Sequence, residues 1–382
     1  MARAMPGGEE ARGERLHVVF VIAGLGAGGA EKVISLISGA WVAQGWRVTI
    51  LAFDAPEDPI YHRFDPRVEI RRFALSTAGG GLKAMLAQGR RIWTIRRTLK
   101  MLRPDAVVSL LTKINVLTLL ATLGMRSPVI VSERNNPLAQ KASAVWNALL
   151  ARLYPRARAI VMQTRASMMC LPSMVHDKVR VIANPIAVPV LDAGASNDAL
   201  VLTAAGRLTS QKGFDLLIDA FAMIAGRHPQ WTLKIWGEGE MRPLLEAQVR
   251  SLDLNGRVLL PGTSTRPGDW VRDGAIMLLS SRYEGFPNVL GEAMAAGLPV
   301  IACDCDFGPR EMISHGVDGL LVPPGDVIAL AQAMEELIAD PQLRASIGER
   351  ARSSAARFAP HKIIQQWEAL ITEIAVQRSI AG

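Results

Sequence analysis

Apolar runs of six to eight residues recur along the chain and alternate with stretches of helical periodicity. In the first half, the runs occupy residues 16–23, 46–53, 105–112, 128–133 and 159–164. Uninterrupted apolar runs are typical of parallel strands that are buried on both faces, and a helix is predicted after the first run, from about Ala30 to Gln44. Strands that alternate with helices predict a doubly wound parallel sheet.

A second series of the same kind occupies the other half of the chain, and its runs are 199–206, 231–237, 257–262, 275–281, 298–303 and 319–324. The segment between the series, 181–198, has prolines and small residues without a regular period, which predicts an interdomain linker. After Asp340 the pattern is helical. We therefore expect an α/β protein with two Rossmann-like doubly wound domains, 15–184 and 196–360, which face a central cleft, and a C-terminal helix, 361–382, that packs back toward the first domain.

Composition favours a globular enzyme over a disordered chain, because 49% of the 382 residues are hydrophobic and 20% are charged. The cysteines, Cys170, Cys303 and Cys305, form no Cys-x-x-Cys pair and have no histidine at zinc-ligand spacing, so neither a disulfide framework nor a metal site is expected. No apolar run reaches the ~20 residues needed to span a bilayer. We expect a soluble or peripheral protein in the cytoplasm.

Basic residues are concentrated in the first half of the chain. Residues 1–190 contain 26 Lys and Arg against 12 Asp and Glu, whereas the remainder contains 17 against 23. This asymmetry predicts an anionic partner for the first half. No zinc-finger, helix-turn-helix or RNA-binding pattern is present, so we expect an anionic membrane surface and no nucleic acid.

The segment from Lys83 to Arg103 contains seven basic residues, no acidic residue and apolar residues at helical spacing. Such a helix can rest on anionic lipid and reach a lipid-borne diphosphate. A packed helix with a solvated basic face is the alternative. The residues expected at the membrane are Arg90, Arg91, Arg96 and Arg97.

A glycine-rich loop, Gly24 to Gly29, lies between the first predicted strand and helix and matches G-x-G-x-x-G, with Asp54 at the end of the next strand. A tight turn, a dinucleotide site and a substrate phosphate site all remain open. We favour the phosphate, because glycines let the backbone approach it and the helix N-terminus offers N–H groups. The residues expected to approach the phosphate are Gly26, Gly28 and Gly29.

Two cations lie in a corresponding loop of the second half, Gly206 to Gly213. The planar guanidinium of Arg207 and the compact ammonium of Lys212 suit two adjacent phosphoryl groups. A surface turn in which both cations are solvated remains the alternative.

The segment Ser281 to Glu292 predicts a strand end, a turn at Gly285 and a helix whose first turn contains Pro287. The N–H groups of Asn288, Val289 and Leu290 are expected to form an anion site. Both carboxylates of the segment can then face one ligand, Glu284 near its sugar and Glu292 near a ribose diol.

These segments resemble the retaining glycosyltransferases of family four, which have the GT-B fold, an Arg and Lys phosphate pair and a Glu-x7-Glu motif. The resemblance covers essentially the whole chain, from the glycine loop through 308–326. It implies that the first domain binds the acceptor and the second the nucleotide sugar, with Glu284, Arg207 and Lys212 as catalytic residues. The implied donor-binding residues are Glu292, Gly285, Phe286, Asn288, Val289 and Leu290.

Within this family, the chain most resembles enzymes that extend polyprenyl-diphosphate-linked oligosaccharides for exopolysaccharide, lipopolysaccharide or protein glycosylation. The resemblance implies transfer of a hexose or N-acetylhexosamine from a nucleotide diphosphate sugar, with a UDP-sugar favoured and GDP-mannose as the alternative. It also implies a lipid-linked glycan acceptor at the inner face of the cell membrane. Because fixed cations and helix-end amides would stabilise the departing diphosphate, no metal or cofactor is expected.

The chain departs from many relatives in one loop. Those enzymes have a histidine after the fourth strand of the first domain, whereas residues 131–137 here contain none. Glu133, Arg134 and Asn135 are expected to line the acceptor and phosphate site instead, with a purely structural loop as the alternative. Two other functions also stay open: a nucleotide-sugar 2-epimerase of similar architecture and a non-catalytic glycan-binding protein.

Overall fold

The computed structural model describes residues 15–26, 28–75, 82–134, 136, 144–188, 200–264 and 268–380. The chain divides into two compact units. One unit contains the chain up to Ser132, Arg156–Ala159 and the segment from Ala369, and the other contains Glu133–Pro155 and Ile160–Glu368. The expected domain limits, 15–184 and 196–360, stay predictions.

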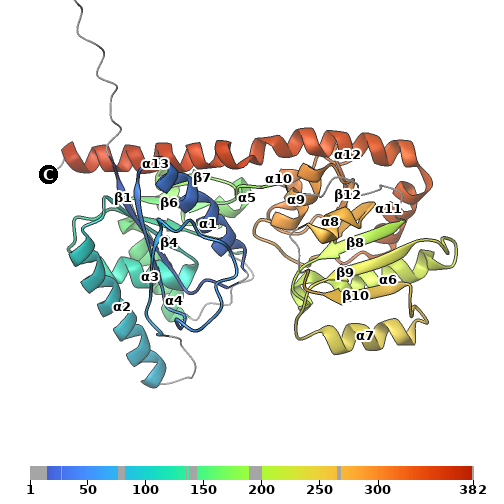
Figure 1. The fold of residues 1–382 in the computed structure, drawn as a ribbon, viewed down its shortest axis with the longest axis horizontal. Helices are drawn as coiled ribbons and strands as arrows, with labels where there is room; N and C mark the ends of the chain where they lie inside the picture. The colour runs from blue at the N-terminus through green and yellow to red at the C-terminus, as the bar shows by residue number, and fades with distance from the viewer. Residues whose placement is uncertain are drawn as a thin grey trace, which may run out of the picture. The chain divides into compact units, whose positions relative to one another are not determined.

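The first series of strands forms a seven-stranded parallel sheet (Figure 1). Its strands are β1 (His17–Ile22), β2 (Arg47–Ala52), β3 (Glu69–Arg72), β4 (Ala106–Leu110), β5 (Val129–Ser132), β6 (Ala159–Met162) and β7 (Val179–Val181). Their order is β3-β2-β1-β4-β5-β6-β7. The five expected strands are confirmed, and the two edge strands, β3 and β7, are additional.

Helices and turns connect these strands: α1 (Gly29–Ala43), α2 (Leu82–Leu102), α3 (Thr112–Ala121), α4 (Ala144–Leu153), η1 (Tyr154–Arg156), α5 (Arg165–Met168) and η2 (Ser173–Lys178). In α1, the buried residues recur at helical spacing, from Val33 and Ile37 to Trp41. The Trp41 ring stacks on Phe20 of β1, with 5.5 Å between ring centroids. The helix therefore packs with its apolar face on the sheet.

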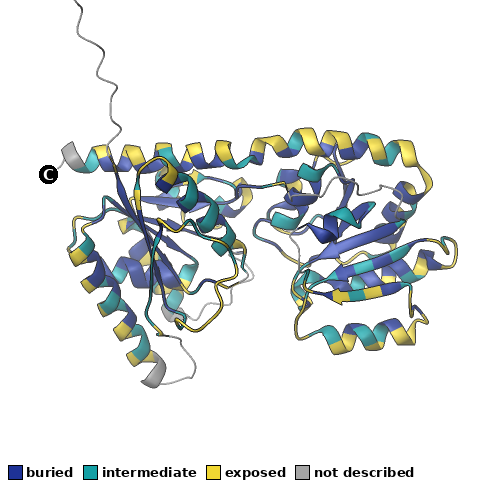
Figure 2. Ribbon diagram, viewed as in Figure 1, coloured by how far each residue is buried: buried dark blue, intermediate teal, exposed yellow. Residues whose placement is uncertain are grey.

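The second series forms a six-stranded parallel sheet whose strands are β8 (Val201–Ala205), β9 (Thr232–Trp236), β10 (Val258–Gly262), β11 (Ile276–Leu279), β12 (Val300–Cys303) and β13 (Leu320–Val322). Their order is β10-β9-β8-β11-β12-β13. All six expected strands are confirmed. Successive residues of β11 alternate between two apolar clusters, with Ile276 in one and Met277 in the other, so the sheet is covered on both faces (Figure 2).

The remaining elements are η3 (Ser210–Lys212), α6 (Phe214–Ala225), α7 (Arg242–Ser251), α8 (Asp269–Arg272), α9 (Asn288–Ala296), α10 (Pro309–Met312), α11 (Val327–Ala339), α12 (Pro341–Ala355), η4 (Ala356–Phe358) and α13 (Pro360–Ile380). The predicted helix after Asp340 is thus α12, η4 and α13. Asp340 caps α12, since its carboxylate accepts the N–H groups of Gln342 and Leu343 at 2.9 Å. None of the helices described is long and apolar enough to cross a membrane.

The expected linker is only partly described, because residues 189–199 lie outside the described ranges. Its first residues are packed rather than solvated: Ile182, Asn184 and Ile186 are buried. The N–H of Ile186 donates to the carbonyl oxygen of Phe358 at 2.8 Å.

Candidate functional site

Lys212 and Glu284 form a buried ion pair at the carboxyl ends of β8 and β11. The distance from Lys212 Nζ to Glu284 Oε1 is 2.6 Å, and only 16% and 6% of the two side chains are exposed. Ser281 Oγ donates to the same carboxylate oxygen at 2.6 Å. The sequence prediction assigned the two charges to one site but did not foresee that they would pair.

Arg207, the other expected phosphate cation, is exposed and has no ion-pair partner among the described residues. Its loop is held closely against the loop after β9. A Cβ added at Gly237, where φ is +138°, would lie 1.9 Å from the carbonyl oxygen of Gly206. Backbone packing therefore positions the loop, and the Arg207 side chain is free to meet a ligand.

A second ion pair joins the same two loops and was not predicted. Arg282 donates to both carboxylate oxygens of Asp215, at 2.8 and 2.6 Å, and to the carbonyl oxygen of Ser210 at 2.8 Å. The hydrogen bond from Arg282 lowers the pKa of Asp215. This pair ties the loop that contains Lys212 to the loop that contains Glu284.

Helix α9 begins at Asn288, with Pro287 as its N-cap residue. Of the three amides expected to face a ligand, that of Leu290 donates to the Pro287 carbonyl oxygen at 3.0 Å. Within the described residues, the N–H groups of Asn288 and Val289 have no acceptor. The helix N-terminus thus offers two backbone donors.

The residues around this N-terminus have different roles. Phe286 belongs to the apolar core and contacts Phe358 edge to face, at 5.5 Å between ring centroids, so its ring does not face a ligand. Glu292 is buried within α9. The backbone of Gly285 packs against Gly308, where φ is +94°. A Cβ added at Gly308 would lie 2.4 Å from Pro287 Cδ and 3.4 Å from the Gly285 carbonyl oxygen. Glycine is therefore required at Gly308, which sequence reasoning did not single out.

Cys303 and Cys305 lie close to this site and are buried as free thiols. Burial raises the pKa of Cys303 to about 11. Burial, and secondarily the charge of Glu284, raises the pKa of Cys305. Both side chains therefore remain neutral thiols at neutral pH. In the described part of the chain, no group of three or more His, Cys, Asp or Glu residues could hold a metal ion.

Arg134 is a buried cation, and its loop forms a network with the start of the expected linker. Its Nη1 donates to Asn184 Oδ1, and its guanidinium lies 5.7 Å from the centroid of the Trp367 ring. Burial lowers the pKa of Arg134 to about 10. The neighbouring Glu133 accepts a hydrogen bond from the Tyr154 hydroxyl. Asn135 lies outside the described residues.

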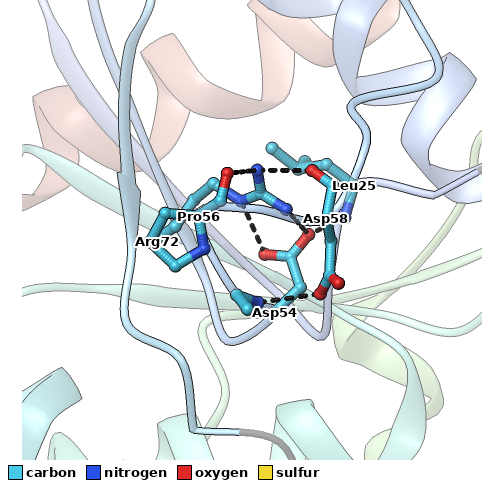
Figure 3. A network of polar contacts seen from close by, with 6 residues as sticks. Leu25, Asp54, Pro56, Asp58 and Arg72 are labelled. Atoms are coloured by element: carbon cyan, nitrogen blue, oxygen red, sulfur yellow. Dashed lines mark hydrogen bonds and ion pairs between the residues drawn. The ribbon is translucent and has the colours of Figure 1, made fainter.

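The glycine loop is tied to β2 by Asp54 (Figure 3). The Asp54 carboxylate accepts the N–H of Leu25 at 2.8 Å and two hydrogen bonds from Arg72, at 3.1 and 2.7 Å. Arg72 also donates to the carbonyl oxygens of Pro56 and Asp58. An aspartate with these partners serves as a structural anchor, which disfavours the dinucleotide interpretation in which it would bind a ribose.

The glycines of this loop differ in their surroundings. Gly26 has no atom within 4 Å of an added Cβ, whereas a Cβ at Gly28 would lie 2.1 Å from Glu31 Oε2. Gly29 is the first residue of α1. His62, which the sequence did not single out, contacts the Gly28 carbonyl oxygen through Nε2 at 3.1 Å. Gly26 therefore offers open backbone, while a side chain at Gly28 would require only that the Glu31 carboxylate move aside.

The four arginines expected at a membrane divide into two pairs by their contacts in the structure, and the membrane contact itself stays a prediction. Arg91 is buried and donates to the Leu75 carbonyl oxygen at 2.7 Å, and Arg96 donates to the carbonyl oxygens of Ala121 and Leu123 at 2.8 and 2.7 Å. Arg90 and Arg97 are exposed. Large apolar side chains are exposed on the same helix, α2: Met85, Leu86, Trp93 and Met101.

Two family models match the chain: "Glycosyl transferase 4-like domain" over residues 28–186 and "Glycosyl transferases group 1" over residues 191–354. An exopolysaccharide phosphotransferase of Streptomyces coelicolor is 33% identical over 74% of the chain, which spans 30% of that relative's length. An uncharacterized glycosyltransferase of Haemophilus influenzae is 29% identical over 50% of the chain, which spans 54% of that protein.

A third relative matches along nearly its whole length. It is a Campylobacter jejuni α-1,4-N-acetyl-D-galactosaminyltransferase, named for an undecaprenol-diphosphate-linked glycan, and is 25% identical over 94% of this chain and 99% of its own. Among solved structures, sucrose-phosphate synthase of Thermosynechococcus elongatus has a TM-score of 0.83 at 20% identity, covering 94% of this chain and 100% of its own. HepE of Anabaena, in complex with UDP, has a TM-score of 0.75 at 21% identity with the same coverage. The expected GT-B fold, with two parallel Rossmann-like domains, is confirmed.

Proposed function

We propose a donor and an acceptor for this chain, which belongs to the group 1 glycosyltransferases of family four, a retaining family. The donor is a nucleotide diphosphate sugar, with a UDP-sugar favoured over GDP-mannose, and the group transferred is a hexose or N-acetylhexosamine. The acceptor is a polyprenyl-diphosphate-linked glycan in polysaccharide or lipopolysaccharide synthesis. Support comes from the undecaprenol-linked glycan in the Campylobacter relative's name and the UDP bound to HepE.

The observation on which the proposal rests most is the Lys212 and Glu284 pair beside the N-terminus of α9. An ammonium has three N–H donors, and Lys212 uses one of them on Glu284, which leaves two for phosphoryl oxygens. The second oxygen of Glu284 is left to accept a sugar hydroxyl. Lys212 thus binds the diphosphate and Glu284 binds the sugar, on the two sides of the bond that breaks.

During transfer, the bond between the anomeric carbon and the diphosphate oxygen breaks, and the acceptor hydroxyl oxygen bonds to that carbon. The hydroxyl proton goes to the departing phosphate. Negative charge on the diphosphate increases as the sugar becomes oxocarbenium-like, so donors fixed in advance lower the barrier. Lys212, Arg207 and the amides of Asn288 and Val289 supply them, while Glu292 binds the nucleoside.

The acceptor phosphate is assigned to the glycine loop. Gly26 offers open backbone to a phosphate, and Gly28 and Gly29 lead into the N-terminus of α1. Glu133, Arg134 and Asn135 are included as predictions from the sequence.

The membrane contact is assigned to the exposed face of α2. Arg90 and Arg97 supply positive charge, and exposed Leu86, Trp93 and Met101 supply apolar and aromatic groups suited to the lipid interface. The proposed location is peripheral, at the inner face of the cell membrane. Replacing Arg90 and Arg97 by glutamine should lower binding to anionic liposomes, and an unchanged bound fraction at low salt would contradict the assignment. The matched control is Arg180→Gln, an exposed arginine on β7.

The decisive experiment measures nucleoside diphosphate release from a panel of UDP- and GDP-sugars, with and without lipid-linked acceptors. Release and sugar transfer should both need Glu284, and Glu284→Gln should lower kcat/KM by about 10²- to 10³-fold. Glu335→Gln is the matched control, because this half-exposed glutamate pairs with Arg227 on the surface. Turnover of the donor to an epimer without acceptor would instead favour the 2-epimerase. Binding of glycan without turnover of any donor would favour a glycan-binding protein.

A further inference from the structure

The side-chain amide of Asn184 connects a buried cation to the first residue of α9. Arg134 Nη1 and Gln163 Nε2 both donate to Asn184 Oδ1, the latter at 2.7 Å, and Asn184 Nδ2 donates to Asn288 Oδ1 at 2.6 Å. Arg134, Gln163 and Asn184 are 8%, 5% and 3% exposed. All four residues belong to one compact unit.

The chemistry of arginine determines which atom donates and which accepts in each hydrogen bond of this network. A guanidinium can only donate, so the atom of Asn184 that faces Arg134 must be the carbonyl oxygen. The Nδ2 group of Asn184 then faces Asn288, which must accept through its own Oδ1. As a result, Asn288 Nδ2 points away from Asn184, and none of the described residues accepts its two N–H groups.

Asn288 is the first residue of α9 and is only partly buried, so a ligand can reach it. Its backbone N–H lacks a helical acceptor, as does that of Val289. Together with Nδ2, this helix end presents several N–H donors and no carbonyl oxygen from the Asn288 side chain. Such a set suits a phosphoryl group.

Arg134, which donates to the Asn184 amide, is an unusual cation, because burying a charge is costly unless the charge is paired. Arg134 has no carboxylate partner among the described residues, and its Nε has no hydrogen-bond acceptor. Its contact with Trp367 and its hydrogen bond to Asn184 are what the structure provides. In a region of low dielectric constant, this charge strongly orients the Asn184 amide.

We propose that Asn184 is a positioning residue that holds Asn288 with Nδ2 toward a phosphoryl oxygen of the nucleotide diphosphate. This inference rests on the proposed function and adds a side-chain donor to the backbone amides of α9. Arg134 and Gln163 act one step further back, by fixing the orientation of the Asn184 amide.

The test is the Asn184→Asp variant. Its side chain has the same shape as that of asparagine, but it should reverse the orientation of the Asn288 amide. One carboxylate oxygen continues to accept from Arg134 and Gln163, while the other requires a donor, so Asn288 turns its Nδ2 inward and its Oδ1 toward the ligand. Calorimetric binding of UDP and GDP should weaken about tenfold, which corresponds to about 1.4 kcal/mol. The thermal midpoint should not fall, because Arg134 gains an ion pair.

The double variant shows whether the effect passes through Asn288. In an Asn288→Ala background, which by itself should weaken binding about tenfold, adding Asn184→Asp should change the Kd less than twofold. An equal loss in both backgrounds, or full affinity of Asn184→Asp, would overturn the inference. If Asn184→Asp does not fold, wild-type affinity of Asn288→Ala would overturn it as well. Failure of the wild-type protein to bind UDP, GDP or any nucleotide sugar would instead remove the proposed function and this inference together.

Discussion

The buried pair of Lys212 and Glu284 allows stability and activity to be separated by mutation. Removing one partner leaves the other charge almost fully buried, since the carboxylate side chain is 6% exposed and the ammonium side chain 16%. Breaking such a pair costs about 3–5 kcal/mol, whereas replacing both charges by neutral groups of similar shape is often close to neutral. Lys212→Met should therefore be strongly destabilised, and Lys212→Met with Glu284→Gln should recover most of the loss.

Activity should behave differently, because both charges are needed for transfer. Lys212→Met, Glu284→Gln and the double variant should each lose at least about 10²-fold in kcat/KM. Urea unfolding followed by circular dichroism measures stability, and nucleoside diphosphate release measures activity. If the double variant is as unstable as the sum of the two single variants, the side chains are not coupled and the reasoning fails.

Two further predictions concern the loops around the site. The lowered pKa of Asp215 means that its pair with Arg282 adds stability above the ordinary aspartate range, and that this stability is lost as the pH falls through the lowered pKa. Asp215→Asn should therefore be less stable than wild type at pH 6, with a gap in urea midpoint that narrows toward pH 3; a constant gap would contradict this. Gly213→Ala should destabilise the protein, because φ is +62° at this position and the added Cβ would lie 2.2 Å from the Ser280 carbonyl oxygen. Gly26→Ala should instead fold normally and raise the KM for the acceptor. Equal urea midpoints for the two variants would contradict this argument from packing.

Most of the fold could be predicted from sequence, because a parallel strand covered on both faces must be apolar along its length. The strands that the prediction missed lack this property. The edge strand β3, Glu69–Arg72, has three charged residues and is half-exposed, and β7, Val179–Val181, has only three residues. Neither produces an apolar run, so their pairing with a neighbour decides their conformation.

The fate of the basic residues on α2 shows a different limit. In the composition of the sequence, nothing distinguishes Arg91 and Arg96 from Arg90 and Arg97. In the structure, however, Arg91 donates to the carbonyl oxygen of Leu75, and Arg96 donates to those of Ala121 and Leu123. Those carbonyls belong to segments distant in sequence. Helical periodicity gives the face on which an arginine lies, but not whether the neighbouring segment presents an acceptor to it.

The candidate site contains residues whose proximity the sequence could predict and contacts that it could not. Strand ends of a parallel sheet share one edge, so the sequence alone could place Lys212 and Glu284 near each other. Their direct pairing depends on the loops between them, which Arg282 and Asp215 lock together over 67 positions of sequence. The relay from Arg134 through Asn184 to Asn288 spans 50 and then 104 positions and has no local pattern. Motifs thus identify the groups that can touch a substrate, whereas the residues that orient those groups become visible only through the hydrogen bonds of the folded chain.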